Sequence, residues 1–281
     1  MSKGLHGPSL RYLDPFGLFP QKPPELDEPD FYVFDRICRK LRDTRHLKLL
    51  YQVYTDSNWA DWHHNQELQW RMMLSYAKPK TVTIRVMLLA QHREDPIRAA
   101  SAVLDASALA LDAGCLGVPL WFEIGNEPNL VGEGFYGDPA TFNTWFMAVL
   151  AELRRRNFPH GVFYPGLSPY PGYLGWYSDP STLEALGVTN GIALHAYNEI
   201  VDGISAALTF LEALGYGHYP VMLSEIGSVL VGSRMEEFKR IDSLYRKYPL
   251  IQAHHIFIVE GKSGGHWPDA YILTEGECRE L

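Results

Sequence analysis

The chain has 281 residues, of which 46% are hydrophobic and 13% are aromatic, and this is enough for a large core. The formal net charge of −8 argues against a protein that binds a nucleic-acid backbone, because such proteins usually carry a basic face. The three cysteines stand far apart in no paired motif, so neither a disulfide framework nor a C-x-x-C metal site is expected.

Segments with strand-like and helix-like patterns alternate along the chain. A short strand is predicted at 3–7 and is followed by a long proline-rich loop. Asp30 is a candidate cap for a helix over 31–42, and the apolar run 47–54 is predicted to be a buried strand. The later predicted strands cover 81–89, 119–127, 161–167, 191–197, 219–226 and 252–259. The later predicted helices cover 66–77, 95–113, 141–156, 181–186, 204–214 and 233–246.

Eight predicted strands that alternate with helices imply right-handed crossovers and a parallel sheet. Eight such units in about 260 residues fit a closed barrel better than an open, doubly wound sheet. The predicted fold is therefore α/β, a (β/α)8 TIM barrel, with residues 1–281 forming a single domain. The first strand has the weakest pattern of the eight, and without it an open sheet becomes the alternative.

Two of the predicted strands end in a glutamate. The apolar run that begins at Trp121 breaks at Glu127, because Pro128 lacks an N–H and disfavours the helical region for the residue before it. The strand at 219–226 ends in Glu225. Since the carboxyl ends of barrel strands meet at one rim, the two carboxylates are predicted to face each other over a pocket.

Two glutamates that flank a pocket are the minimum equipment for hydrolysis of a glycosidic bond. One carboxyl group must stay protonated to donate to the leaving oxygen, and the other must stay ionised to attack. Asn126, beside the first glutamate, is placed to bind a sugar hydroxyl, and hydrogen bonds of this kind strengthen in the transition state.

Three motifs carry a resemblance to a known family. Residues 125–129, Gly-Asn-Glu-Pro-Asn, resemble the Asn-Glu-Pro motif of the clan A glycoside hydrolases. Residues 223–227, Leu-Ser-Glu-Ile-Gly, resemble that clan's strand-seven motif, and residues 194–197, Leu-His-Ala-Tyr, resemble its strand-six His-x-Tyr. Their order and spacing also match those of the clan, which consists of retaining TIM-barrel enzymes.

The resemblance implies a retaining β-glycoside hydrolase that cleaves a β-linked oligo- or polysaccharide through a glycosyl-enzyme intermediate. It implies that Glu127 is the acid/base and Glu225 the nucleophile, with carboxyl groups about 5–5.5 Å apart. It further implies that His195 and Tyr197 position Glu225 and the sugar next to the scissile bond.

Aromatic residues crowd the predicted loops at the carboxyl ends of the strands. Flat aromatic faces pack against the C–H faces of sugar rings, and their number favours an elongated cleft and endo action. Many clan members end strand eight with a tryptophan, but here residues 256–260 contain none, so Trp267 is assigned to the floor of the sugar site. The other aromatic candidates are Trp59, Trp62, Tyr136, Tyr170, Tyr173, Trp176 and Tyr177.

Alternation along the fourth strand places Glu123 on the same side as Glu127, inside the barrel. A buried carboxylate needs a partner, and Arg85 on the neighbouring third strand is the candidate, in a structural role.

No cofactor or metal is expected. The histidine pairs at 63–64 and 254–255 are adjacent in sequence and would point to opposite faces of a strand, and no nucleotide-binding loop is present. The expected partner is a carbohydrate substrate bound by a monomer, without nucleic acid or membrane. No apolar run approaches the length of about 20 residues that spans a bilayer. Residues 1–7 lack a secretion-type apolar segment, so a cytoplasmic location is the default expectation unless a signal peptide has been removed.

Two alternatives remain open at the level of sequence. One is a barrel that binds carbohydrate without catalysis. The presence of both glutamates in the sequence argues against this alternative. The other is a metal-dependent, sugar-converting barrel enzyme, in which several carboxylates and a histidine surround a divalent cation.

Overall fold

The computed structural model describes residues 4–6, 39–42, 44–53, 59–133, 135, 137–228 and 234–256. For residues 4–6, 59–62 and 133 it describes the backbone alone. Several sequence predictions therefore lie outside the described residues: most of the helix over 31–42, the end of the strand over 252–259, Tyr136 and Trp267. No helix among the described residues is long and apolar enough to cross a bilayer.

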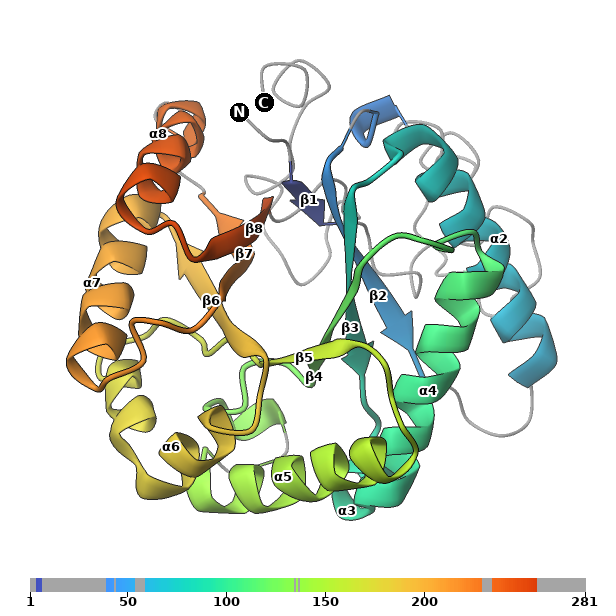
Figure 1. Cartoon of the computed structure of the whole chain (residues 1–281), viewed down its shortest axis with the longest axis horizontal. Coiled ribbons are helices and arrows are strands. Elements are labelled where there is room, and N and C mark those ends of the chain that lie inside the picture. The colour runs from blue at the N-terminus through green and yellow to red at the C-terminus, as the bar shows by residue number, and fades with distance from the viewer. Residues whose placement is uncertain are drawn as a thin grey trace.

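Eight parallel strands form a closed barrel in the order β1 to β8, which confirms the predicted (β/α)8 fold (Figure 1). Each strand pairs with the next one along the chain, and the barrel closes where Leu5 of β1 pairs with Ile256 of β8. The strands are β1 Gly4–His6, β2 His46–Gln52, β3 Thr81–Met87, β4 Leu120–Ile124, β5 Gly161–Tyr164, β6 Gly191–Tyr197, β7 Val221–Gly227 and β8 Ile251–Ile256.

Helices surround the barrel on its outer side, as Figure 1 shows. They are α2 Trp59–Ala77, α3 Ala90–Glu94, α4 Pro96–Asp112, α5 Pro139–Arg155, α6 Pro180–Leu186, α7 Ile200–Ala213 and α8 Arg234–Lys247, with short 3₁₀ turns η3 Val131–Glu133 and η4 Tyr173–Ser178. The prediction for α2 was too short, because the helix begins at Trp59 and not at residue 66. Residues 59–65 show no clear apolar period, but they contain neither glycine nor proline and so extend the helix without interruption.

Three of the outer helices begin with the same dipeptide, Asp-Pro. The aspartates that precede α4, α5 and α6 each accept a hydrogen bond from a backbone N–H of the first turn. The proline that follows takes the first helical position, where its missing N–H costs nothing. These caps fix the residue at which each of the three helices starts.

The side chains inside the barrel form layers. Thr83 on β3 donates to the sulfur of Met222 on β7 at 3.1 Å, and since these strands are not neighbours, the contact crosses the barrel interior. Met222 packs there with Phe163 and Ala193, and Trp121 covers the group. The outward-facing residues of the strands pack instead against the helices in a separate, larger core. Above the apolar interior layer, toward the carboxyl ends of the strands, the interior becomes charged.

Candidate active site

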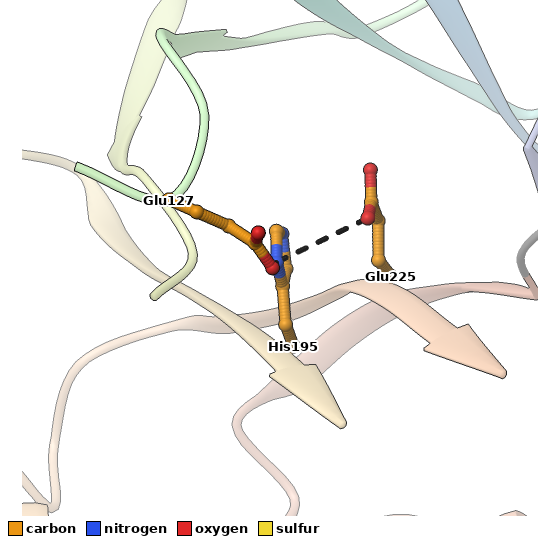
Figure 2. A group of neighbouring side chains, drawn as sticks. All are labelled: Glu127, His195 and Glu225. Atoms are coloured by element: carbon orange, nitrogen blue, oxygen red, sulfur yellow. Dashed lines mark hydrogen bonds and ion pairs between the residues drawn. The ribbon is translucent and has the colours of Figure 1, made fainter. Parts of the chain in front are cut away.

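Four side chains singled out by the sequence motifs meet at the carboxyl end of the barrel. Glu127 follows β4, His195 and Tyr197 lie on β6, and Glu225 lies on β7. One carboxylate oxygen of Glu127, one of Glu225 and a ring nitrogen of His195 all lie within 4.8 Å of one another. Figure 2 shows Glu127 reaching from its loop toward the other two residues. The two glutamates therefore face each other, as predicted.

A β-bulge on β7 brings Glu225 into the barrel. Leu194 of β6 pairs with Leu223, but the next residue, His195, pairs with Glu225, so Ser224 is an extra residue. The Ser224 hydroxyl donates to Glu123 inside the barrel, while Glu225 also faces inward. Strict alternation would have directed one of these two side chains toward the helices. The bulge therefore allows two consecutive polar residues to face the interior.

The backbone at Glu127 is in the left-handed region, with a φ of +36°. This conformation is uncommon for a residue with a side chain, and it persists only where the surroundings enforce it. The Glu127 N–H donates to the carbonyl of Gly166 at 3.1 Å, and its carbonyl accepts from the N–H of Leu130 at 2.8 Å. Glu127 is thus fastened to the loop that follows β5.

The ring of His195 lies between Glu127 and Arg85. Its Nδ1 lies 2.9 Å from Oε1 of Glu127, and its Nε2 lies 2.8 Å from Nη2 of Arg85. A guanidinium only donates, so Nε2 must be the accepting nitrogen. In the neutral form the ring therefore carries its hydrogen on Nδ1 and donates it to Glu127. Burial lowers the pKa of His195, but the carboxylates of Glu225, Glu123 and Glu127 outweigh it and raise that pKa above its usual value.

Glu225 accepts hydrogen bonds from a guanidinium and a hydroxyl group. Arg85 donates to one of its oxygens, and the hydroxyl of Tyr197 donates to the other at 2.5 Å. The ammonium of Lys48 lies 3.7 Å away. Burial and the neighbouring Glu225 carboxylate raise the pKa of Tyr197 well above its usual range, so its hydroxyl keeps its hydrogen. These groups stabilise a negative charge on Glu225.

Beneath the two glutamates, Glu123 sits at the centre of a fully buried ion network. Arg85 donates to both of its oxygens at 3.1 Å, as the alternation argument predicted. Lys48 of β2, which the sequence analysis missed, lies 2.8 Å from Oε2. Burial raises the pKa of Glu123, but Arg85 and Lys48 outweigh it and hold that pKa well below its usual range. Burial and the repulsion of Arg85 lower the pKa of Lys48 to about 8.

Gly166 leaves room for the imidazole of His195. A Cβ at Gly166 would lie 2.2 Å from Cδ2 and 2.3 Å from Nε2 of that ring. The ring is buried and bound on both nitrogens, so it cannot move away without breaking those contacts. We expect Gly166→Ala to lower the free energy of unfolding by about 1–3 kcal/mol, as overpacking does.

Urea denaturation measures this effect, and Gly203→Ala on α7 is the matched control. A Cβ at Gly203 meets nothing within 4 Å. This control should be neutral or stabilising by up to about 1 kcal/mol, because alanine favours a helix. A Gly166→Ala variant as stable as the wild type would contradict the packing argument.

The remaining predicted site residues are placed differently. Asn126 is half-buried next to Glu127. Trp59 begins α2, and the structure describes only its backbone. Trp176 in η4 is buried, and its indole N–H donates to the hydroxyl of Tyr164 at 2.7 Å. This bond anchors the loop after β5, and Trp176 also lines the groove described next, so its predicted contact with a sugar stays a prediction.

A groove of about 420 Å³ lies over the loops that follow β4 and β5. Its lining includes Asn129, which is two residues beyond Glu127. Tyr170 and Tyr173, from the predicted aromatic loop, also line it and are more exposed than Trp176. The aromatic surface near the site is therefore provided more by these tyrosines than by the tryptophan.

The group formed by Glu127, His195 and Glu225 could also supply ligands to a metal ion. Two carboxylate oxygens and one imidazole nitrogen are donors that divalent cations accept. Arg85 and Lys48, however, hold buried positive charges beside Glu225, and these charges repel a dication. The oxygens of Glu225 also already accept from Arg85 and Tyr197, and Oε1 of Glu127 accepts from His195, so a metal ion would have to displace these contacts.

No protein-family model matches the chain, and no curated protein sequence matches it. Solved structures do match it in fold. A glucosidase from Croceicoccus marinus gives a TM-score of 0.58 at 10% identity over 91% of this chain, and the chain spans 58% of that protein's length.

Two further matches cover both chains almost completely. A GH128 endo-β-1,3-glucanase from Amycolatopsis mediterranei, in complex with laminaripentaose, gives a TM-score of 0.55 at 11% identity over 100% of this chain and 99% of its own. An endo-β-1,4-glucanase from Xanthomonas axonopodis pv. citri gives 0.58 at 14% identity, over 99% and 98%. At such low identities the likeness establishes the fold alone, and the chain folds as these three enzymes do.

Proposed function

We propose that the protein is a retaining β-glycoside hydrolase. The observation that carries the proposal is the close approach of the Glu127 and Glu225 carboxylates, which have oxygens within 4.8 Å of each other at the carboxyl end of the barrel. Retaining enzymes place their two carboxyl groups about 5–5.5 Å apart, whereas inverting enzymes leave a wider gap for water. Glu225 attacks the anomeric carbon while Glu127 protonates the leaving oxygen, and Glu127 then activates the water that releases the sugar.

The surroundings of the two glutamates support this assignment of roles. Glu225 accepts hydrogen bonds from Arg85 and Tyr197, which keep it ionised and ready to attack. Glu127 differs from Glu225 in its contacts, because its Oε1 accepts from Nδ1 of His195 and has no hydrogen bond from Arg85 among the described contacts. Pairs of carboxyl groups in unequal environments are the usual basis for separate acid and nucleophile roles.

The proposed substrate is a β-linked oligo- or polysaccharide, with endo cleavage favoured. The groove beside the Glu127 loop supports this, because the exposed Tyr170 and the half-buried Tyr173 provide flat faces for sugar rings. Two structures that match over nearly the full length of both chains are named as an endo-β-1,3-glucanase and an endo-β-1,4-glucanase. We therefore propose β-glucans as the first substrates to test.

The test is hydrolysis of a panel of β-glucans and aryl β-glycosides, followed by NMR of the first product formed. We expect the β-anomer to appear first and then to mutarotate, because double displacement retains configuration. An α-anomer as first product would contradict the retaining mechanism. Binding of glucans without any turnover would favour the non-catalytic alternative.

Exhaustive chelation addresses the metal-dependent alternative. We expect the same hydrolysis rate before and after treatment with EDTA, because Arg85 and Lys48 disfavour a cation beside Glu225. The loss of activity on chelation, with recovery on addition of one divalent cation, would contradict the proposed mechanism.

A further inference from the structure

The side chain of Asn129 ties the loop that carries Glu127 to the loop after β5. Its Nδ2 donates to the carbonyl of Ser168 at 2.9 Å, and its Oδ1 accepts from the N–H of Ser168 at 2.9 Å. Asn129 is 4% exposed, so water does not readily replace these bonds. The side-chain amide of Asn129 both donates to Ser168 and accepts from it. An ionised aspartate cannot donate, and an aliphatic side chain of similar size can do neither, so neither replaces this pair of bonds at neutral pH.

This pairing is one of several that bind the two loops along their length. The Glu127 N–H donates to the Gly166 carbonyl, and the hydroxyl of Tyr170 donates to the carbonyl of Asn129 at 3.0 Å. Residues 127 and 129 therefore lie against 166, 168 and 170 in register. Holding Glu127 at a φ of +36° costs about 1–3 kcal/mol of free energy. The hydrogen bonds between the two loops offset this cost.

We propose that Asn129 is a positioning residue that holds Glu127 in its left-handed conformation, with its carboxyl group aimed at the reacting bond. The proposal rests on the acid/base role of Glu127 in the proposed function. Without the amide pair, Glu127 relaxes toward a common backbone conformation and its carboxyl group leaves His195. Glu225 keeps its place, because Arg85 and Tyr197 hold it independently of this loop.

The loss of activity that follows from displacing Glu127 should depend on the leaving group of the substrate. Protonation of the leaving group matters greatly for a poor leaving group and little for a good one such as dinitrophenolate. In Asn129→Ala we expect kcat/KM for an unactivated β-linked oligosaccharide to fall about 100-fold, within the range that general acid catalysis contributes. We expect kcat/KM for the dinitrophenyl β-glycoside of the same sugar, which reports formation of the glycosyl-enzyme, to stay within about 5-fold of the wild-type value.

Two further variants separate positioning from a general loss of structure. Asn143→Ala removes another buried asparagine, whose Nδ2 donates to Thr182 and whose Oδ1 accepts from Tyr164, between α5, β5 and α6. This control should leave the ratio of the two substrates unchanged. Asn129→Asp should show the selective loss at neutral pH and recover part of the oligosaccharide activity, relative to wild type, as the pH falls, because a protonated carboxyl group again donates to Ser168.

Equal losses on both substrates in Asn129→Ala would overturn the positioning role while leaving the proposed function intact. So would an unchanged rate on the oligosaccharide. A wild-type protein that hydrolyses neither substrate would overturn the proposed function itself, and the inference with it.

Discussion

Replacing Glu225 with glutamine should lower turnover of both activated and unactivated β-glycosides by more than about 10⁴-fold, since the glycosyl-enzyme bond cannot form. Glutamine keeps the size of the side chain and can still accept from Tyr197, so the variant should fold. The measurement is kcat/KM on a β-linked oligosaccharide and on its dinitrophenyl glycoside. The exposed Glu212→Gln on α7 is the control and should match the wild type.

The companion variant Glu127→Gln should behave differently on the two substrates. Turnover of the oligosaccharide should fall about 10²–10⁴-fold, because the leaving oxygen is no longer protonated. Formation of the glycosyl-enzyme from the dinitrophenyl glycoside should be much less affected. If the dinitrophenyl glycoside instead restores turnover in Glu225→Gln and not in Glu127→Gln, the roles of the two glutamates are reversed. A wild-type rate in either variant contradicts the assignment.

Arg85→Met is expected to have the largest effect on stability. It leaves the buried carboxylates of Glu123 and Glu225 with Lys48 as their remaining cation, and breaking such a buried pair costs about 3–5 kcal/mol. Urea denaturation at neutral pH measures the change. In the control, Arg155→Met removes an exposed partner of Glu152 and should change the free energy of unfolding little, because solvent screens an exposed pair. Equal losses in the two variants would contradict the importance of burial.

The same variant should also change the response of stability to acid. The pKa of Glu123 is held well below its usual 4.5 in the folded chain, so below pH 4.5 the unfolded chain binds a proton that the folded chain does not. Stability should therefore decline as the pH falls through this region. Without Arg85, the pKa of Glu123 rises toward its usual value and the acid-induced loss should become shallower. A steeper loss would contradict this account.

The sequence predicted those parts of the site that follow from regular alternation. The period-two pattern of the fourth strand places Glu123 inside the barrel, next to Arg85, as the structure has it. The buried Lys48 was missed because it is one charge in an apolar run, and nothing in the run shows which face it takes. Identifying it needs the knowledge that its neighbours across the barrel are carboxylates.

The parts that alternation could not predict are irregular ones. The extra residue Ser224 on β7 is visible only from the register of its neighbours. The pairing of Asn129 with Ser168 joins loops that are distant in sequence and have no periodic pattern. The exposure of Trp176 was not predictable either: its side chain is mostly buried, because sequence alone does not distinguish an exposed aromatic face from a buried one.

The bulge on β7 limits how this site could be transferred to another protein. A designer who copied Glu225 into a regular strand of a different barrel, without Ser224 as the additional residue, would direct either the carboxylate or its neighbouring hydroxyl outward, toward the helices. The transferable unit is therefore the irregular strand segment together with the cations beneath it. Deletion of a single residue from β7 would remove the arrangement as effectively as replacing the glutamate.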